Sequence, residues 1–142
     1  MNIFTLFETE FATILRSLQE QGRLPADLDS GRVVFELPRE ISHGDVACNA
    51  AMVLAKPASM KPRDLAERLV PEFQKIDGVT AVEIAGPGFI NLRVEPRLWT
   101  AEIDAIIDAG TDYGRNRSGG GRPINVEYVS ANPTGPLHAA HA

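Results

Sequence analysis

The sequence has little cysteine, few aromatic residues and no long uninterrupted apolar run. Cys48 is the single cysteine among 142 residues, so no disulfide can form within the chain and nothing suggests secretion. Residues 1–22 carry Glu8, Glu10 and Arg16, unlike the apolar core of a signal peptide. No apolar stretch approaches the roughly 20 residues that a membrane-spanning helix needs. We therefore expect a cytoplasmic protein that makes no membrane contact.

Positive charge is also scarce. The chain has 14 Lys and Arg residues against 19 Asp and Glu residues, a net charge of -5. This balance argues against a non-specific nucleic-acid coat, although it leaves room for a local positive face. Two basic groups could meet phosphates, or could simply be solvated. The first group is Lys56, Lys61, Arg63, Arg68 and Lys75, and the second is Arg115, Arg117 and Arg122.

The apolar pattern is that of a mixed globular fold. Hydrophobic residues make up 44% of the chain and charged residues 23%, an ordinary balance for a domain with a core. Apolar residues at three- and four-residue steps predict helices over 2–21, 46–55, 62–75 and 96–109. β-branched and alternating segments predict strands over 32–38, 79–84 and 89–94, the last two forming a hairpin. We therefore expect an α+β fold with helices packed on a small antiparallel sheet.

Two of these helices carry more specific expectations. Asp45 precedes the 46–55 segment, and we interpret it as the N-cap that accepts bonds from free amides of that helix. A proton-transfer pair of His43 and Asp45 is the alternative. In the 96–109 helix we expect the apolar residues to form the inner side; they are Leu98, Trp99, Ile103, Ile106 and Ile107.

A glycine-rich joint divides the sequence. Residues 118–121 predict a flexible link, so we expect one domain over 1–118 and the beginning of a second over 119–142. After the joint, a predicted strand over 123–129 runs into a Gly/Pro loop and a helix start. This order opens a Rossmann-like sheet, in which ligands bind beyond the carboxyl ends of the strands and helix N-termini attract phosphates.

Two histidines follow that loop, three residues apart. His138 and His141 share a helix face and could donate hydrogen bonds to a phosphate or stabilise charge in a transition state. Spacing alone favours a simpler alternative, one surface histidine and one packing histidine. A zinc site normally needs three or four ligands, and His43 and Cys48 are remote in sequence, so we expect no metal.

Several segments, in order, resemble one family. The run from Glu127 to His141 resembles the part of class I aminoacyl-tRNA synthetases that leads into their "HIGH" signature. The stretch 130–136, Ser-Ala-Asn-Pro-Thr-Gly-Pro, resembles the arginyl-tRNA synthetase family in particular. Four earlier stretches look like the N-terminal domain of that family: 43–45, 49–52, 54–56 and 85–91.

The resemblance implies an activity and a set of site residues. Such an enzyme activates arginine with ATP and Mg²⁺, releases pyrophosphate and transfers the arginyl group to tRNA(Arg). It implies catalytic, ATP-contacting roles for His138 and His141, and an arginine pocket with Glu127, Ser130 and Asn132. Ala140 adjoins the ATP where the signature usually has glycine. The motif region comprises Ala131, Asn132, Pro133, Thr134, Gly135, Pro136, Leu137, His138, Ala139, Ala140 and His141.

The resemblance also implies that the first domain binds the outer corner of tRNA(Arg), around the D-loop. The matching residues are Phe89 and Asn91, which strand alternation places on the same face of the sheet. A ring can stack on an unpaired base while an amide bonds to the base edge. Two simpler interpretations remain open: Phe89 belongs to the core, and Gly86 and Gly88 form an ordinary turn.

We therefore interpret the chain as the amino-terminal part of a longer synthetase that we expect to be monomeric, ending as the catalytic domain begins. We expect it to bind the tRNA corner, to hold no cofactor and to be inactive alone. The main alternative is a free-standing RNA-binding module without a catalytic role. A second alternative is an interaction domain with no role in RNA binding.

Overall fold

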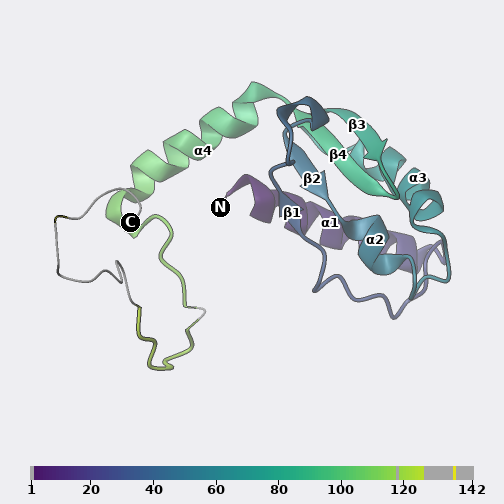
Figure 1. Cartoon of the computed structure of the whole chain (residues 1–142), viewed down its shortest axis with the longest axis horizontal. Helices are drawn as coiled ribbons and strands as arrows, with labels where there is room; N and C mark the ends of the chain where they lie inside the picture. Colours follow the sequence, from purple (N-terminus) through teal and green to yellow (C-terminus); the bar gives the residue numbers. More distant parts are fainter. Residues whose placement is uncertain (1, 118, 127–135, 137–142) are drawn as a thin grey trace. The chain divides into compact units, whose positions relative to one another are not determined.

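The computed structural model describes residues 2–117, 119–126 and 136, and divides the chain into two compact units, Met1–Ala109 and Gly110–Ala142. The first unit contains helices α1 (Ile3–Glu20), α2 (Ala50–Leu54), α3 (Pro62–Phe73) and α4 (Pro96–Ala109), and strands β1 (Phe35–Glu36), β2 (Val46–Cys48), β3 (Val79–Ala85) and β4 (Phe89–Val94) (Figure 1). None of the helices in the described residues has the length and apolar character that crossing a bilayer requires.

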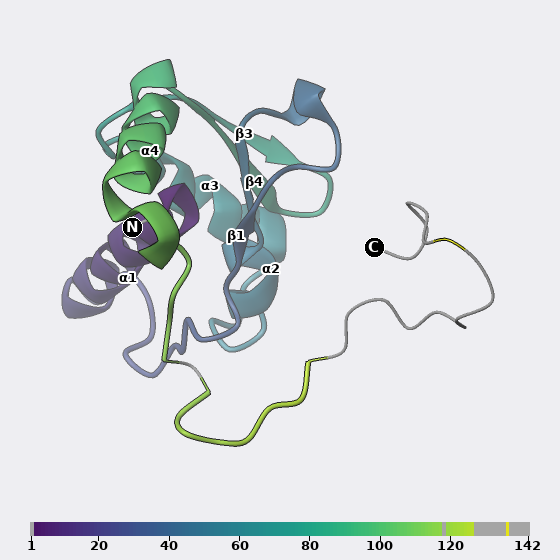
Figure 2. The same cartoon turned by 90° about the vertical axis from the view of Figure 1, so that its left-hand side faces the viewer.

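The strands form one antiparallel sheet in the order β1-β2-β4-β3. Helix α1 lies against β1, α2 against β4, and α3 against β3 and β4 (Figures 1 and 2). The predicted α+β class, with helices on a small antiparallel sheet, is confirmed. The β3–β4 hairpin and the helices predicted over 2–21, 62–75 and 96–109 are present, within a few residues of their expected ends.

Helix α1 shows how local sequence determines where a helix begins, where it ends and which face it buries. The Asn2 side chain caps it by accepting from the Thr5 amide at 2.8 Å, and Gly22 follows its end with φ +67°. Its apolar stripe is buried: Ile3, Phe7, Phe11, Leu15 and Leu18. The ring of Phe11 stacks on that of Phe73 at 5.7 Å between centroids, so α1 and α3 share an aromatic core.

The helix predicted over 46–55, with Asp45 as its cap, is wrong. Residues Val46–Cys48 form β2 between β1 and β4, and only Ala50–Leu54 are helical. Pairing on both sides of β2 outweighs the helix preference of this alanine-rich stretch. The Asp45 carboxylate accepts instead from the Val94 amide at 2.9 Å. The strand predicted over 32–38 is also reduced, to Phe35–Glu36.

Helix α4 forms as predicted, but the prediction that its whole apolar stripe faces inward is wrong. Leu98 and Trp99 are partly buried against the core, and Trp99 meets Phe4 edge to face at 6.5 Å. Ile103, Ile106 and Ile107 are exposed, at 55%, 40% and 70%. Amphipathic spacing identifies an apolar face, but whether another segment packs on that face depends on residues far away in the sequence. The described residues leave these three isoleucines exposed.

In the second unit the described residues form a short 3₁₀ turn at Gly110–Asp112 and further turns. The strand predicted over 123–129 is not formed at 123–126, and no other strand in the described part of this unit is available to pair with those residues. Residues 127–129 lie outside the described residues, as does most of the loop beyond them. The expected joint at 118–121 lies inside this second unit.

Candidate nucleic-acid interface

Strand β4 presents different residues to the two faces of the sheet. Ile90, Leu92 and Val94 are buried in the core beneath the helices. Alternation therefore directs Phe89, Asn91 and Arg93 to the opposite, open face. The sheet register places four residues in one row across that face, one from each strand: Glu36, Ala47, Asn91 and Glu83.

A cavity of about 400 Å³ lies over this row. Its lining comes from the end of β1, the following loop, β2, the hairpin turn and β4. The residues are Glu36, Leu37, Pro38, Arg39, Glu40, His43, Ala47, Ala85, Gly86, Phe89 and Asn91. Alanine and glycine at three of these positions leave the volume unfilled.

Asn91 is the buried polar residue of this cavity, with only 6% of its surface exposed. Among the described residues, no group forms a hydrogen bond with its side chain, whereas the Asn49 amide accepts from the Val34 N–H at 2.8 Å. No fully enclosed side-chain nitrogen or oxygen of a described residue lacks a partner, so the Asn91 amide must open into the cavity. Its two donors and its carbonyl oxygen are available to a ligand.

Phe89 lies at the edge of the cavity with 40% of its surface exposed, so it is not the core residue that the simpler interpretation requires. The adjoining turn is held in place. A Cβ at Gly88 would lie 3.0 Å from Pro62, so this turn packs tightly on the start of α3. Arg63 Nη1 also donates to the Gly86 carbonyl at 3.4 Å.

The loop of residues 37–44, which we call the wall loop, closes one side of the cavity. Its tip is bonded to β4, since Arg93 Nη2 donates to the Ser42 carbonyl at 2.7 Å. The sequence pattern did not predict this loop or Arg93 as parts of the site. The signal that pointed here was the resemblance of residues 43–45 to the family, which we interpreted as a helix cap instead.

Neither sequence interpretation of His43 and Asp45 holds. Asp45 bonds to Val94, and the described residues contain no ion pair between the two side chains. His43 is exposed and lines the cavity. His43 therefore belongs to the wall loop and Asp45 joins that loop to β4, and the two do not form a proton relay.

Charge at the cavity is mixed, because its lining includes Arg39 together with the acids Glu36 and Glu40. In the first predicted basic group, Arg63 pairs with Glu67 at 3.7 Å and Lys75 with Glu72 at 2.6 Å. In the second group Arg115 pairs with Asp112 at 2.9 Å. Acidic partners therefore offset the charge of some residues in each group.

The predicted catalytic and substrate residues lie outside the described residues: Glu127, Ser130, Asn132, His138, Ala140 and His141. Of the motif region over 131–141, only Pro136 is described, and it is exposed. Within the described residues no cluster of three or more His, Cys, Asp or Glu side chains could hold a metal ion. Cys48 is buried, and burial raises the pKa of its thiol to about 12, so it is no nucleophile at neutral pH.

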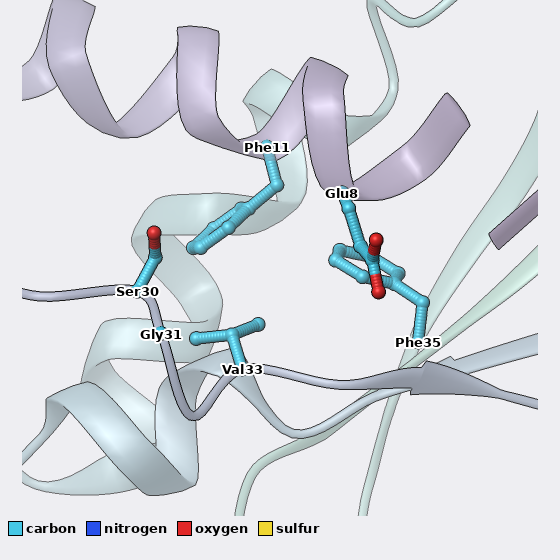
Figure 3. A pocket seen from close by; sticks show the side chains of 6 residues that line it. All are labelled: Glu8, Phe11, Ser30, Gly31, Val33 and Phe35. Carbon is cyan, nitrogen blue, oxygen red and sulfur yellow. The ribbon is translucent and has the colours of Figure 1, made fainter. Parts of the chain in front are cut away.

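A second cavity, of about 300 Å³, lies between α1 and the segment that leads into β1. Figure 3 shows its lining, with the Phe11 and Phe35 rings between the helix and the extended segment, and Glu8 projecting from the helix. The two rings belong to the core and Glu8 is exposed. This cavity presents no unpartnered polar group comparable to Asn91 among its described residues.

Comparisons with known proteins match this architecture. The family model described as "Arginyl tRNA synthetase N terminal domain" matches residues 6–94, a range that covers the sheet, helices α2 and α3 and most of α1. The chain is 56% identical over 141 residues to the arginine–tRNA ligase of Parvibaculum lavamentivorans. It is 50% identical over 141 residues to that of Rhodospirillum rubrum and 52% over 141 residues to that of Rhizobium meliloti.

Each of these matches covers 99% of this chain but 24% of the relative. The chain thus spans about a quarter of the length of the curated relatives it matches. The family model covers more than half of the chain, and the elements that surround the Asn91 cavity fall within its range. The chain belongs to the arginyl-tRNA synthetase N-terminal domain family.

Proposed function

We propose that this chain is the tRNA-binding part of an arginine–tRNA ligase, and that its open sheet face binds an unstacked base from the D-loop corner of tRNA(Arg). The observation that carries the proposal is Asn91, a residue only 6% exposed whose side-chain amide has no hydrogen-bond partner among the described residues. An unpaired base has polar edges that can bond to such an amide, and a π face that can stack on the nearby Phe89 ring.

The size and shape of the site fit this ligand class. A cavity of about 400 Å³ over small side chains has room for a base together with part of its ribose. Phe89 stands at the edge, where a base turned out of a loop would enter. The chain's net charge of -5 indicates local recognition in place of a broad electrostatic attraction to RNA.

The test measures the affinity of the 142-residue chain for a labelled tRNA(Arg) transcript. Phe89→Ala and Asn91→Ala should each weaken binding about tenfold, since stacking contributes roughly 1–3 kcal/mol per base. Ile107→Ala is the matched control for loss of an exposed apolar side chain, and Gln74→Ala for loss of an exposed amide. Equal affinities for the site variants and the controls would overturn the proposal.

A direct spectroscopic readout complements the affinities. The side-chain NH₂ signals of Asn91 should shift on addition of tRNA(Arg), because the amide gains a hydrogen-bond partner. A shift confined to other residues would show that RNA binds elsewhere on the chain. The side-chain amide of Gln74 serves as an internal reference, since Gln74 is exposed directly after α3 and does not line the cavity.

The parent enzyme's chemistry is part of the same proposal. In it, His138 and His141 contact the phosphates of ATP, which is bound with Mg²⁺ next to Ala140, while Glu127, Ser130 and Asn132 contact arginine. Residues 1–118 then form the tRNA-binding domain, and 119–142 begin the catalytic one. The parent is a cytoplasmic monomer in this proposal.

Arginine-dependent exchange between ATP and pyrophosphate tests whether catalysis needs the full-length parent and these two histidines. The 142-residue chain should give no exchange, and the full-length parent should give exchange that falls about 10²- to 10³-fold in His138→Ala or His141→Ala, as expected for loss of a transition-state contact. The Gln74→Ala parent is the control. Exchange by the 142-residue chain, or full exchange by the histidine variants, would contradict the assignment.

A further inference from the structure

The wall loop, residues 37–44, is anchored in an unusual way. The backbone bonds of its 3₁₀ turn are local, from His43 N–H to the Glu40 carbonyl at 3.0 Å and from Gly44 N–H to the Ile41 carbonyl at 3.2 Å. These bonds shape the turn but do not fix its distance from the sheet. The contacts that do so come from β4, the strand that also carries Phe89 and Asn91.

The end of the wall loop is held to β4 by hydrogen bonds of Asp45. Asp45 N–H donates to the Leu92 carbonyl at 2.8 Å, and the Asp45 carboxylate accepts from the Val94 N–H at 2.9 Å. Gly44 approaches so closely that a Cβ there would lie 2.7 Å from the Leu92 carbonyl oxygen. Residues 44 and 45 therefore cannot move away from β4 without loss of these bonds.

The tip of the loop is fixed by one side chain. Arg93 stands on the open face of β4 two residues beyond Asn91, and its Nη2 donates to the Ser42 carbonyl at 2.7 Å. This charge-assisted bond sets how far the loop stands from the Asn91 amide, and so sets the width of the cavity. Because its guanidinium already binds the loop, Arg93 is suited to positioning the wall.

The wall loop also carries an arginine, Arg39, that does not hold the loop to the sheet. Arg39 is exposed, lines the cavity, and forms no ion pair or hydrogen bond with any described residue. The neighbouring loop side chains Leu37 and Ile41 are 63% and 93% exposed, so the loop offers apolar surface beside this charge. An exposed guanidinium next to a base-sized cavity suits a phosphodiester oxygen.

We propose that Arg93 is a positioning residue for RNA binding, and that Arg39, on the loop it holds, contacts the phosphate next to the bound base. This inference rests on the proposed function, since it assumes that the Asn91 cavity takes a base of tRNA(Arg). It adds a wall and a phosphate contact to the Phe89 and Asn91 face.

Salt dependence separates the two roles. A side chain that neutralises a phosphate of single-stranded RNA contributes about 0.7 to the slope of log affinity against log salt. Arg39→Met should therefore weaken binding of the chain to tRNA(Arg) about three- to tenfold at low salt and reduce that slope by about 0.7. Arg93→Met should weaken binding by a similar factor and leave the slope unchanged. Arg93→Lys should restore affinity to within about twofold, since an ammonium can also donate to the Ser42 carbonyl.

Controls make every outcome decisive. Arg16→Met removes an exposed arginine on α1, away from the cavity, and should change neither affinity nor slope. Thermal unfolding should show that all four variants fold. A reduced slope in Arg93→Met would mean that Arg93 itself meets phosphate, and an unchanged slope in Arg39→Met would mean that Arg39 does not; either result overturns the inference. If Asn91→Ala also binds tRNA(Arg) normally, the proposed function is overturned together with the inference. If Asn91→Ala binds more weakly, only the roles of Arg39 and Arg93 are overturned.

Discussion

Gly44 sits where the wall loop meets the sheet, and Gly44→Ala tests how closely the two must approach. Its backbone has φ +109° and ψ -157°, a combination that glycine adopts and L-residues with a Cβ avoid. An added methyl would also lie 2.7 Å from the Leu92 carbonyl oxygen and 3.3 Å from its carbon. The substitution therefore meets a conformational penalty and a steric one at the same residue.

The two penalties have comparable sizes. Holding a residue with a Cβ in this region costs about 1–3 kcal/mol. Relieving the overlap requires the loop to move off β4, which adds about 1–3 kcal/mol of overpacking or the loss of the Asp45–Leu92 backbone bond. Reduced freedom of the unfolded chain offsets about 0.4–1 kcal/mol. We expect Gly44→Ala to lower the free energy of unfolding by about 2–4 kcal/mol.

Urea unfolding followed by circular dichroism measures this loss. Gly22→Ala is the matched control, because Gly22 also has positive φ, +67°, but has no atom within 4 Å of an added Cβ. That control should lose only about 1 kcal/mol, the cost of the left-handed conformation alone. If Gly44→Ala were no less stable than Gly22→Ala, the close approach of the wall loop to β4 would be refuted.

Three other side chains give shorter tests. Lys75, and after it Arg23, lowers the pKa of the Glu72 carboxyl. At a pH above the ordinary pKa of 4.5, Glu72→Gln should therefore lower the free energy of unfolding in urea by about 0.5 kcal/mol. This loss should disappear once the pH has fallen through the lowered pKa. A difference that persists in acid would contradict this. Because burial raises the pKa of Cys48 to about 12, a disulfide reagent at mildly alkaline pH should modify the folded chain no faster than it unfolds, and modification faster than unfolding would be inconsistent with the buried thiol. Asn91→Leu should raise the free energy of unfolding by about 0.5–1 kcal/mol while weakening tRNA binding, and a loss of stability would show that the amide is satisfied.

The sequence predicted those elements whose formation depends on their own residues. Helix α1 has a capping side chain at Asn2, a regular apolar stripe and a glycine after its end, so period and punctuation agree. The β3–β4 hairpin likewise has alternation on both sides of a Gly-Pro-Gly turn. In both cases the partners that stabilise the element lie within or beside it in sequence, and pattern alone was sufficient.

Elements that depend on distant partners were the ones predicted wrongly. The alanine-rich stretch 46–55 favours a helix as a whole, yet its first three residues form a strand because β1 and β4 pair with them from either side. The exposure of Ile103, Ile106 and Ile107 has the same origin, since their spacing is amphipathic whether or not a neighbour covers them. A periodic pattern describes a face and does not identify what lies against it.

In the candidate site, too, the features that depend on neighbouring residues were predicted and those that depend on distant residues were not. Alternation placed Phe89 and Asn91 on one face, and the structure agrees. The wall loop could not be predicted, because the bond that holds it joins Arg93 to Ser42, 51 positions away along the chain. The same holds for Asp45, whose partner Val94 lies 49 positions away. No local pattern distinguishes such residues from solvated surface charges.

Asn91 links the stability of this sheet to its proposed use. Its neighbours Ile90 and Leu92 are fully buried, so the strand is held by apolar contacts on the helix side and gains nothing from an amide on the other. A mostly buried residue whose amide has no protein partner makes the fold about 0.5–1 kcal/mol less stable than an apolar residue would. An apolar residue of similar size would fill the space above Ala47 without that penalty. The amide therefore makes physical sense as a group whose partner arrives with the ligand, and this is why the cavity above it, and not the larger exposed surface of α4, is where we place the RNA base.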